Sequence, residues 1–203
     1  MRYIFVLLLF VSSAPFASSE IIYDMFFRVG AFDGLDETLV VDPNSSIGDV
    51  QLILRETTTA GEDSAMEAGV RSIGINVLST HPNSFTSQTP NSEFATPNGA
   101  GTDEDTLFSF SLFGLAASQR ISSNVVEFTM GTIDLVGPPV AEETTFALED
   151  FDTGQDNFLL ASGAIDNLVT PRTLTITAIP EPSAVLMLAA IGACVSVRRR
   201  RRA

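Results

Sequence analysis

The sequence predicts an all-β protein whose body is a single antiparallel β-sandwich. Short runs of apolar residues alternate with polar ones, as in residues 49–56 (DVQLILRE), where Val50, Leu52 and Leu54 would share one face of a strand. Turn-forming residues separate these runs, and helical periodicity is scarce. About seven to nine strands in a body of roughly 160 residues are enough for one two-layer domain with its own core.

The first 19 residues have the pattern of a secretory signal peptide. Arg2 supplies the positive start, and residues 4–11 form an apolar run that is too short to span a bilayer. Small residues then lead to Ser19, where we expect cleavage. Residues 20–179 should therefore be exported and form the β-sandwich domain.

The strands of the body are expected where apolar residues alternate or run together. In chain order they are residues 21–29, 37–42, 49–56, 71–77, 106–115, 126–135 and 172–179. Residues 61–70 (GEDSAMEAGV) fit one helical turn or a short helix. Residues 79–105 are rich in Ser, Thr, Asn, Pro and Gly, which predicts a long loop, disordered or loosely attached.

The charge of the body is strongly negative. All 25 acidic residues lie between Glu20 and Glu181, and this stretch holds only five of the 11 basic residues and no lysine. Such a surface repels a phosphate backbone, so nucleic-acid binding is excluded. The composition predicts a solvated exterior, and binding of divalent cations is the alternative.

The C-terminus has three parts in a fixed order. Residues 180–182 are Pro-Glu-Pro, and residues 183–197 are uncharged and mostly apolar. The basic cluster that ends the chain consists of Arg198, Arg199, Arg200, Arg201 and Arg202. A helix over residues 183–197 would be shorter than the ~30 Å hydrocarbon core of a bilayer, so the arginine stems would have to snorkel. Arginines resist translocation, which predicts a stop-transfer cluster that stays in the cytoplasm.

This order of Pro180, Glu181 and Pro182, an apolar run and an arginine cluster resembles the PEP-CTERM sorting signal. The resemblance implies export by the general secretion machinery, a membrane-bound intermediate and recognition by an exosortase. It also implies cleavage near the Pro-Glu-Pro motif and placement at the cell surface or in the extracellular matrix of an exopolysaccharide-producing bacterium. Permanent anchoring by the C-terminal transmembrane helix is the alternative.

Several phrases of the body resemble cohesin-like sandwiches, which are jelly-roll relatives of carbohydrate-binding modules. These phrases are DVQLILRET, AGVRSIGINV and FALEDFDTGQDNFLLASGAIDNLVT, followed by a last strand that runs into the sorting motif. The resemblance implies a non-catalytic structural, adhesive or ligand-binding role, with exopolysaccharide or another surface protein as the partner. Cohesins bind dockerins, but no contact residue can be transferred to this chain.

The residues available for catalysis are few. His81 is the only histidine and is expected to be solvated in the long loop, and the only cysteine, Cys194, lies in the C-terminal apolar run. Without lysine or a body cysteine, thiol and Schiff-base chemistry are excluded, so we expect no enzyme. A secreted polysaccharide hydrolase that uses paired carboxylates is the alternative. The body has no tryptophan and one tyrosine with which to stack a sugar.

Two acidic segments are candidate calcium sites, because calcium takes oxygen ligands in a flexible shell. The first is residues 103–105; the second offers Asp150, Asp152 and Asp156 as ligands. The second segment departs from the EF-hand pattern, which requires other residues in the places of its glycine and alanine. We therefore expect a solvated turn and no cofactor, with calcium as the alternative.

Overall fold

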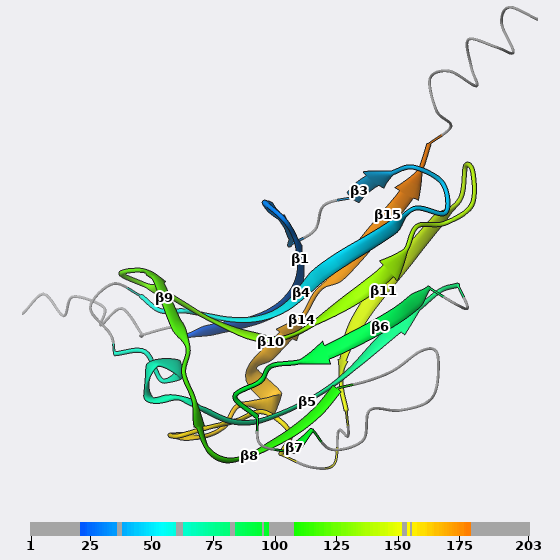
Figure 1. Ribbon diagram of the computed structural model, residues 1–203. Coiled ribbons are helices and arrows are strands. Elements are labelled where there is room, and N and C mark those ends of the chain that lie inside the picture. The colour runs from blue at the N-terminus through cyan, green and yellow to red at the C-terminus, as the bar shows by residue number, and fades with distance from the viewer. Residues whose placement is uncertain are drawn as a thin grey trace, which may run out of the picture.

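The structure is a computed structural model (Figure 1). It describes residues 21–35, 38–59, 63–81, 84–94, 96–97, 108–151, 154 and 156–179. These residues form strands and two short 3-10 turns and contain no α-helix, which confirms the prediction of an all-β protein. The expected signal peptide, the Pro-Glu-Pro motif, the apolar segment and the arginine cluster lie outside the described residues.

The first sheet has the strand order β14-β1-β4-β10-β6. Its strands are β1 (Ile22–Val29), β4 (Ser46–Thr57), β6 (Phe85–Pro90), β10 (Val125–Val136) and β14 (Val169–Pro171), with β2 (Phe32–Gly34) beside β1 and β9 (Gln119–Ser122) beside β10. Both β1 and β10 pair antiparallel with β4. Val50, Leu52 and Leu54 are fully buried, as their alternation predicted.

The second sheet has the order β13-β12-β5-β11-β15-β3, with β8 beside β5 and β7 beside β8. Its strands are β3 (Thr38–Val41), β5 (Val70–Ser79), β7 (Thr96–Pro97), β8 (Phe108–Ala116), β11 (Glu143–Asp150), β12 (Leu159–Leu160), β13 (Gly163–Ala164) and β15 (Thr173–Ala178). β15 is therefore hydrogen-bonded on both sides, to β11 and to β3.

One hydrophobic cluster contains residues of both sheets. Phe146 of β11 meets Phe27 of β1 and Phe85 of β6, with ring centroids 6.4 Å and 5.5 Å away and in edge-on geometry. Aromatic pairs in this geometry add to the stabilisation that burial gives. Leu174 and Ile176 of β15 are fully buried in the same cluster.

The expectation of a purely antiparallel arrangement is wrong for two strand pairs. β14 runs parallel to β1, and β3 runs parallel to β15. Short hairpins force neighbouring strands to be antiparallel, but each of these pairs joins strands from opposite ends of the described chain. The direction of these strands is therefore set by packing and not by a turn.

The expected loop over residues 79–105 contains two strands. β6 pairs with β10, and β7 pairs with β8, so a continuous loop was the wrong prediction there. In the described part of the sheet β6 has one neighbour, and its polar sequence (FTSQTP) suits such an edge position. Among the described residues 63–70, the structure has a single 3-10 turn, η1 (Met66–Ala68), which is the shorter of the two expected forms.

Candidate functional site

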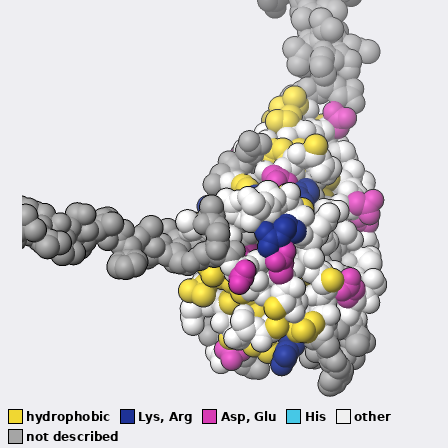
Figure 2. Space-filling model, turned by 90° about the vertical axis from the view of Figure 1, so that its left-hand side faces the viewer, with side chains coloured by type: hydrophobic (Ala, Val, Ile, Leu, Met, Phe, Trp, Pro, Cys, Tyr) yellow, Lys and Arg dark blue, Asp and Glu magenta, His cyan; other side chains and the backbone are white. Residues whose placement is uncertain are grey.

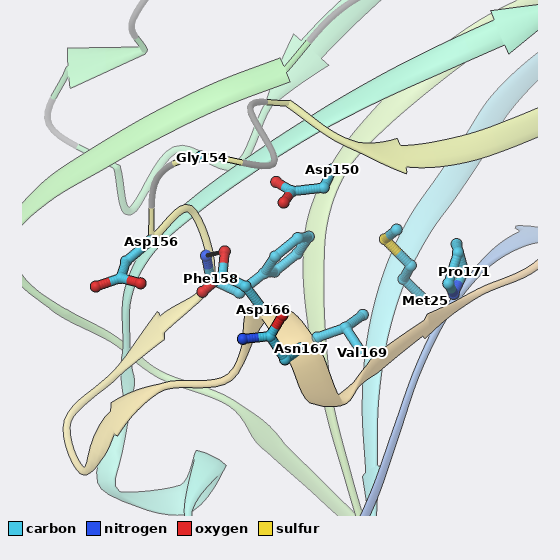
Figure 3. A pocket seen from close by; sticks show the side chains of 9 residues that line it. All are labelled: Met25, Asp150, Gly154, Asp156, Phe158, Asp166, Asn167, Val169 and Pro171. Atoms are coloured by element: carbon cyan, nitrogen blue, oxygen red, sulfur yellow. Dashed lines mark hydrogen bonds between the residues drawn. The ribbon is translucent and has the colours of Figure 1, made fainter.

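A pocket with a volume of about 370 Å³ lies beside the second 3-10 turn, η2 (Asp166–Leu168) (Figure 3). Three carboxylates line it, from Asp150 at the end of β11, from Asp156 and from Asp166. Its apolar lining includes Met25 of β1 and Phe158. The pocket thus combines acidic groups with an apolar wall.

Asp166 holds the chain at this pocket through its Oδ1 atom. This oxygen accepts backbone hydrogen bonds from Asn157 at 2.6 Å and from Phe158 at 2.9 Å. Its second oxygen, Oδ2, is buried without a hydrogen-bond partner. The Asn157 side chain in turn donates from Nδ2 to Asp150 Oδ1 at 2.6 Å. These contacts connect the end of β11 to the segment before β12.

A glycine on β5 makes room for this arrangement. A Cβ atom at Gly74 would lie 2.9 Å from Asn157 Oδ1 and 3.1 Å from Asn157 Cβ, which is closer than such contacts normally are. Any larger residue at position 74 would displace Asn157. Asp150 would then lose the hydrogen bond that Asn157 donates.

The structure describes two of the three aspartates that the sequence offers as calcium ligands. Asp150 and Asp156 both line the pocket, whereas Asp152 lies outside the described residues. In the view of Figure 3 the carboxylate of Asp156 points away from those of Asp150 and Asp166. Across the described part of the chain, no three acidic, histidine or cysteine side chains are placed to hold a metal ion. Calcium binding at Asp150, Asp152 and Asp156 stays the alternative to the predicted solvated turn.

A cluster of ion pairs, which sequence reasoning missed, lies on the first sheet. We call Arg28, Asp33, Arg55 and Glu127 the ion-pair cluster. Arg28 Nη1 lies 2.8 Å from Glu127 Oε2, Arg55 Nη2 lies 2.9 Å from Asp33 Oδ2, and Arg28 also pairs with Asp33. The guanidinium carbon of Arg55 lies 4.5 Å from the ring centroid of the buried Phe26. Figure 2 shows basic and acidic side chains next to each other in the middle of one face.

The ion-pair cluster keeps its carboxylates charged. Burial opposes the ionisation of Glu127, but the hydrogen bonds from Arg28 and Arg55 outweigh it and lower the pKa of Glu127. The pKa of Asp33 is lowered chiefly by its hydrogen bond from Arg28, against a smaller effect of burial. Both carboxylates therefore remain ionised to lower pH than they would in an unfolded chain.

A second buried polar group supports η1. Glu56 is fully buried and accepts backbone hydrogen bonds from Ala65 at 3.1 Å and from Met66 at 2.9 Å. Burial, and then the charge and hydrogen bonding of Glu56, raise the pKa of the Tyr23 hydroxyl well above its usual range. This arrangement fixes the 3-10 turn against β4.

His81 is held by side chains and is not simply solvated. Its Nε2 atom lies 3.3 Å from Glu142 Oε2, and its Nδ1 atom lies 3.2 Å from the hydroxyl oxygen of Thr144. Its side chain is 37% exposed. These contacts attach the start of the expected loop to β11, which sequence analysis did not predict.

The described chain ends where the second sheet passes into the sorting segment. Ile179 is the last described residue, and its backbone N–H points to the carbonyl oxygen of Val41 at 3.4 Å. The chain therefore leaves the body directly from β15. A model of the PEP-CTERM protein-sorting motif matches residues 178–202.

Residues 178–202 are a PEP-CTERM sorting motif. Such a motif implies an exported protein that an exosortase sorts to the surface, with a membrane-anchored stage before processing. The match begins two residues before Pro180, inside β15. The last residue of the folded body and the first residues of the motif thus overlap.

Two solved structures are similar to this chain at low identity. One is a crystal structure of a CaDoc0917–CaCohA2 complex, with a TM-score of 0.42, 10% identity and coverage of 78% of this chain and 99% of the other. The other is the sixth cohesin of scaffoldin B from Acetivibrio cellulolyticus in complex with a dockerin variant, with a TM-score of 0.43, 10% identity and coverage of 78% and 98%. At this similarity neither match assigns a partner to this chain.

Comparison with curated proteins gives no significant match. Within the described residues, no helix has the length and apolar character needed to cross a membrane. The expected membrane segment, residues 183–197, lies outside those residues.

Proposed function

We propose that the protein is an exosortase substrate whose β domain is delivered to the cell surface or the extracellular matrix and acts there without catalysis, as a structural, adhesive or ligand-binding module. The observation that carries this proposal is the sorting motif over residues 178–202. The expected signal peptide, residues 1–19, supplies the export step that must come before sorting. The tail is then removed near Pro180, Glu181 and Pro182.

The contacts made by the carboxylates of the body support a non-catalytic role. The carboxylates of the ion-pair cluster are neutralised by Arg28 and Arg55, and Glu56 is occupied by backbone N–H groups. A hydrolase with two carboxylates would need a free acid and a free base across an open site. In the described pocket, Asp150 and Asp166 accept hydrogen bonds from Asn157.

The intact mass of the protein from its native cells tests the sorting step. We expect the mature protein to start near Glu20 and to end near Pro182. A protein that keeps residues 183–203 and remains in the membrane fraction would instead be a permanently anchored surface protein. A protein found in the cytosol with both ends intact would overturn the proposal.

A matched pair of variants makes the test specific. Glu181→Ala changes the motif and should leave the precursor uncleaved in the membrane fraction. Glu149→Ala removes an exposed acidic side chain from β11 and should be processed as the unchanged protein is. The surface partner is then sought by capture from exopolysaccharide-containing matrix with the mature protein, with nucleic acid as a negative control.

A further inference from the structure

Exposed apolar side chains gather at the end of the body from which the chain leaves. We call Val40, Val140 and Ile179 the exit patch; they are 55%, 55% and 50% exposed. In Figure 1, β3, the end of β15 and the turn between β10 and β11 lie together at this end. Figure 2 shows hydrophobic side chains at the same upper end of the molecule.

Backbone contacts confirm that the three segments are neighbours. Val40 is opposite Thr177 in the parallel pair of β3 and β15. The residue after Val140, Ala141, donates its backbone N–H to the carbonyl oxygen of Ala178 at 3.2 Å. Side chains alternate along a strand, so Ile179 lies on the same face of β15 as Thr177. The backbone segments that carry the three side chains are therefore adjacent, across β3, the end of β15 and the turn.

The short connection between Ile179 and the expected membrane segment limits how far the exit patch can lie from the membrane. Only residues 180–182 separate Ile179 from the expected membrane segment that begins at residue 183. Even when fully extended, this connection spans at most about 14 Å. The headgroup layer is itself about 5 to 8 Å thick on each side of a bilayer. While the tail is in the membrane, the exit patch must lie against the membrane surface or a protein embedded there.

The acidic residues beside the exit patch favour docking against a protein and not against lipid. Asp42 follows β3, and Glu142 and Glu143 follow Val140; all three are exposed. Anionic headgroups repel such a rim, and surfaces that bind membranes by charge are basic. A protein surface that carries apolar and basic groups complements both the patch and its rim.

We propose that the exit patch is a docking surface for the membrane-bound processing enzyme that reads residues 180–182. This inference rests on the proposed sorting function and extends it from the motif to the folded body. A patch of three side chains is too small to hold a stable complex alone. The short connection keeps it near the enzyme at an effective concentration in the millimolar range, so a weak contact is sufficient.

The test is a pulse–chase measurement of precursor cleavage, with the full-length chain in its native cells. The double variant Val40→Thr, Val140→Thr keeps β-branched side chains but removes apolar surface. We expect its precursor to be cleaved about tenfold more slowly, with an unchanged melting temperature. The control is Ile121→Thr, Leu168→Thr, which changes two residues that are 52% and 59% exposed in β9 and η2 and should be cleaved normally.

Two further results separate the outcomes. If Glu181→Ala blocks cleavage but the exit-patch variant is cleaved at the normal rate, the docking proposal is wrong and the sorting proposal stands. If Glu181→Ala is cleaved normally, the sorting proposal itself fails. Hydrogen exchange is also measured on the precursor in vesicles of phosphatidylethanolamine and phosphatidylglycerol without the enzyme. We expect the amides of residues 40 and 140 to exchange freely there. Their protection by lipid alone would overturn the proposal in favour of a membrane contact.

Discussion

Arg28 donates two hydrogen bonds to Glu127, from Nη1 to Oε2 at 2.8 Å and from Nη2 to Oε1 at 2.9 Å. The two residues lie on β1 and β10, and β4 runs between these strands. Arg55 on β4 also donates to Glu127, so three neighbouring strands are joined by one carboxylate. The Glu127 side chain is 5% exposed, which separates this contact from an ordinary surface ion pair.

Replacing Glu127 with glutamine should destabilise the protein by about 2 kcal/mol, because two partly buried guanidinium groups lose their shared counter-charge. Urea unfolding measures the change. The control is Glu67→Gln, which breaks the exposed pair with Arg120 and should leave the free energy of unfolding unchanged within error. Equal losses in the two variants would show that burial of the ion-pair cluster is unimportant.

Acid should weaken the fold through the same cluster. The pKa values of Asp33 and Glu127 are lowered in the folded protein. The unfolded chain therefore takes up protons at higher pH than the folded chain does. The stabilisation is present above the unfolded pKa values of about 4 and is lost as the pH falls through the lowered folded values. Urea unfolding between pH 7 and pH 2 should show this loss. The free energy of unfolding of Glu127→Gln should depend less steeply on pH than that of the unchanged protein.

Phe146→Ala should cost about 3 to 5 kcal/mol, because it removes the ring that contacts Phe27 and Phe85 and leaves a cavity between the sheets. Thermal and urea unfolding measure the loss. Phe151→Ala, at a side chain that is 41% exposed, is the matched control and should change stability little. Similar losses at both positions would contradict the placement of Phe146 in the shared core.

Glu56→Ala should destabilise the protein by about 3 kcal/mol, because it leaves the partly buried backbone N–H of Ala65 and the buried one of Met66 without acceptors. Tyr23→Phe removes a single hydrogen bond to Glu56 and should cost about 1 kcal/mol. Unfolding in urea gives both values. A larger loss for Tyr23→Phe than for Glu56→Ala would contradict the assignment of Glu56 as the main support of the 3-10 turn.

Millimolar calcium should leave the melting temperature unchanged if residues 150–156 form the solvated turn that the sequence predicts. The measurement is a thermal melt with calcium and with a chelator. A rise in melting temperature with calcium that Asp150→Asn and Asp156→Asn abolish would instead establish the calcium site that the sequence offers.

The sequence predicts those strands well that have one apolar and one polar face. β4 and β15 lie where the alternation placed them, because burial of one face is a local signal with a period of two residues. β6 was missed because an edge strand beside β10 needs little apolar surface and resembles a loop in composition. Its existence depends on β10, which is distant in the sequence.

The polar groups of the body were harder to predict for a similar reason. Glu127 occupies the outward position of an alternating strand, where a solvated side chain is normally expected. It is buried because Arg28 and Arg55, at separations of 99 and 72 residues, fold over it. Asp166 gives no recognisable signal either, since its backbone partners, Asn157 and Phe158, come close only when the chain turns back through β12 and β13. Asp150 and Asp156 were identified as candidate ligands from the acidic composition of their segment.

The two-sided pairing of β15 has a mechanical consequence. β15 ends at Ala178, and the next residue, Ile179, still donates its backbone N–H to Val41, so a pull on the last described residue acts along the strand axis. The ladders to β11 and β3 would both be loaded in shear, and their bonds would have to break together and not one by one. A body tethered through this strand is therefore well suited to bear tension between the cell and its surroundings.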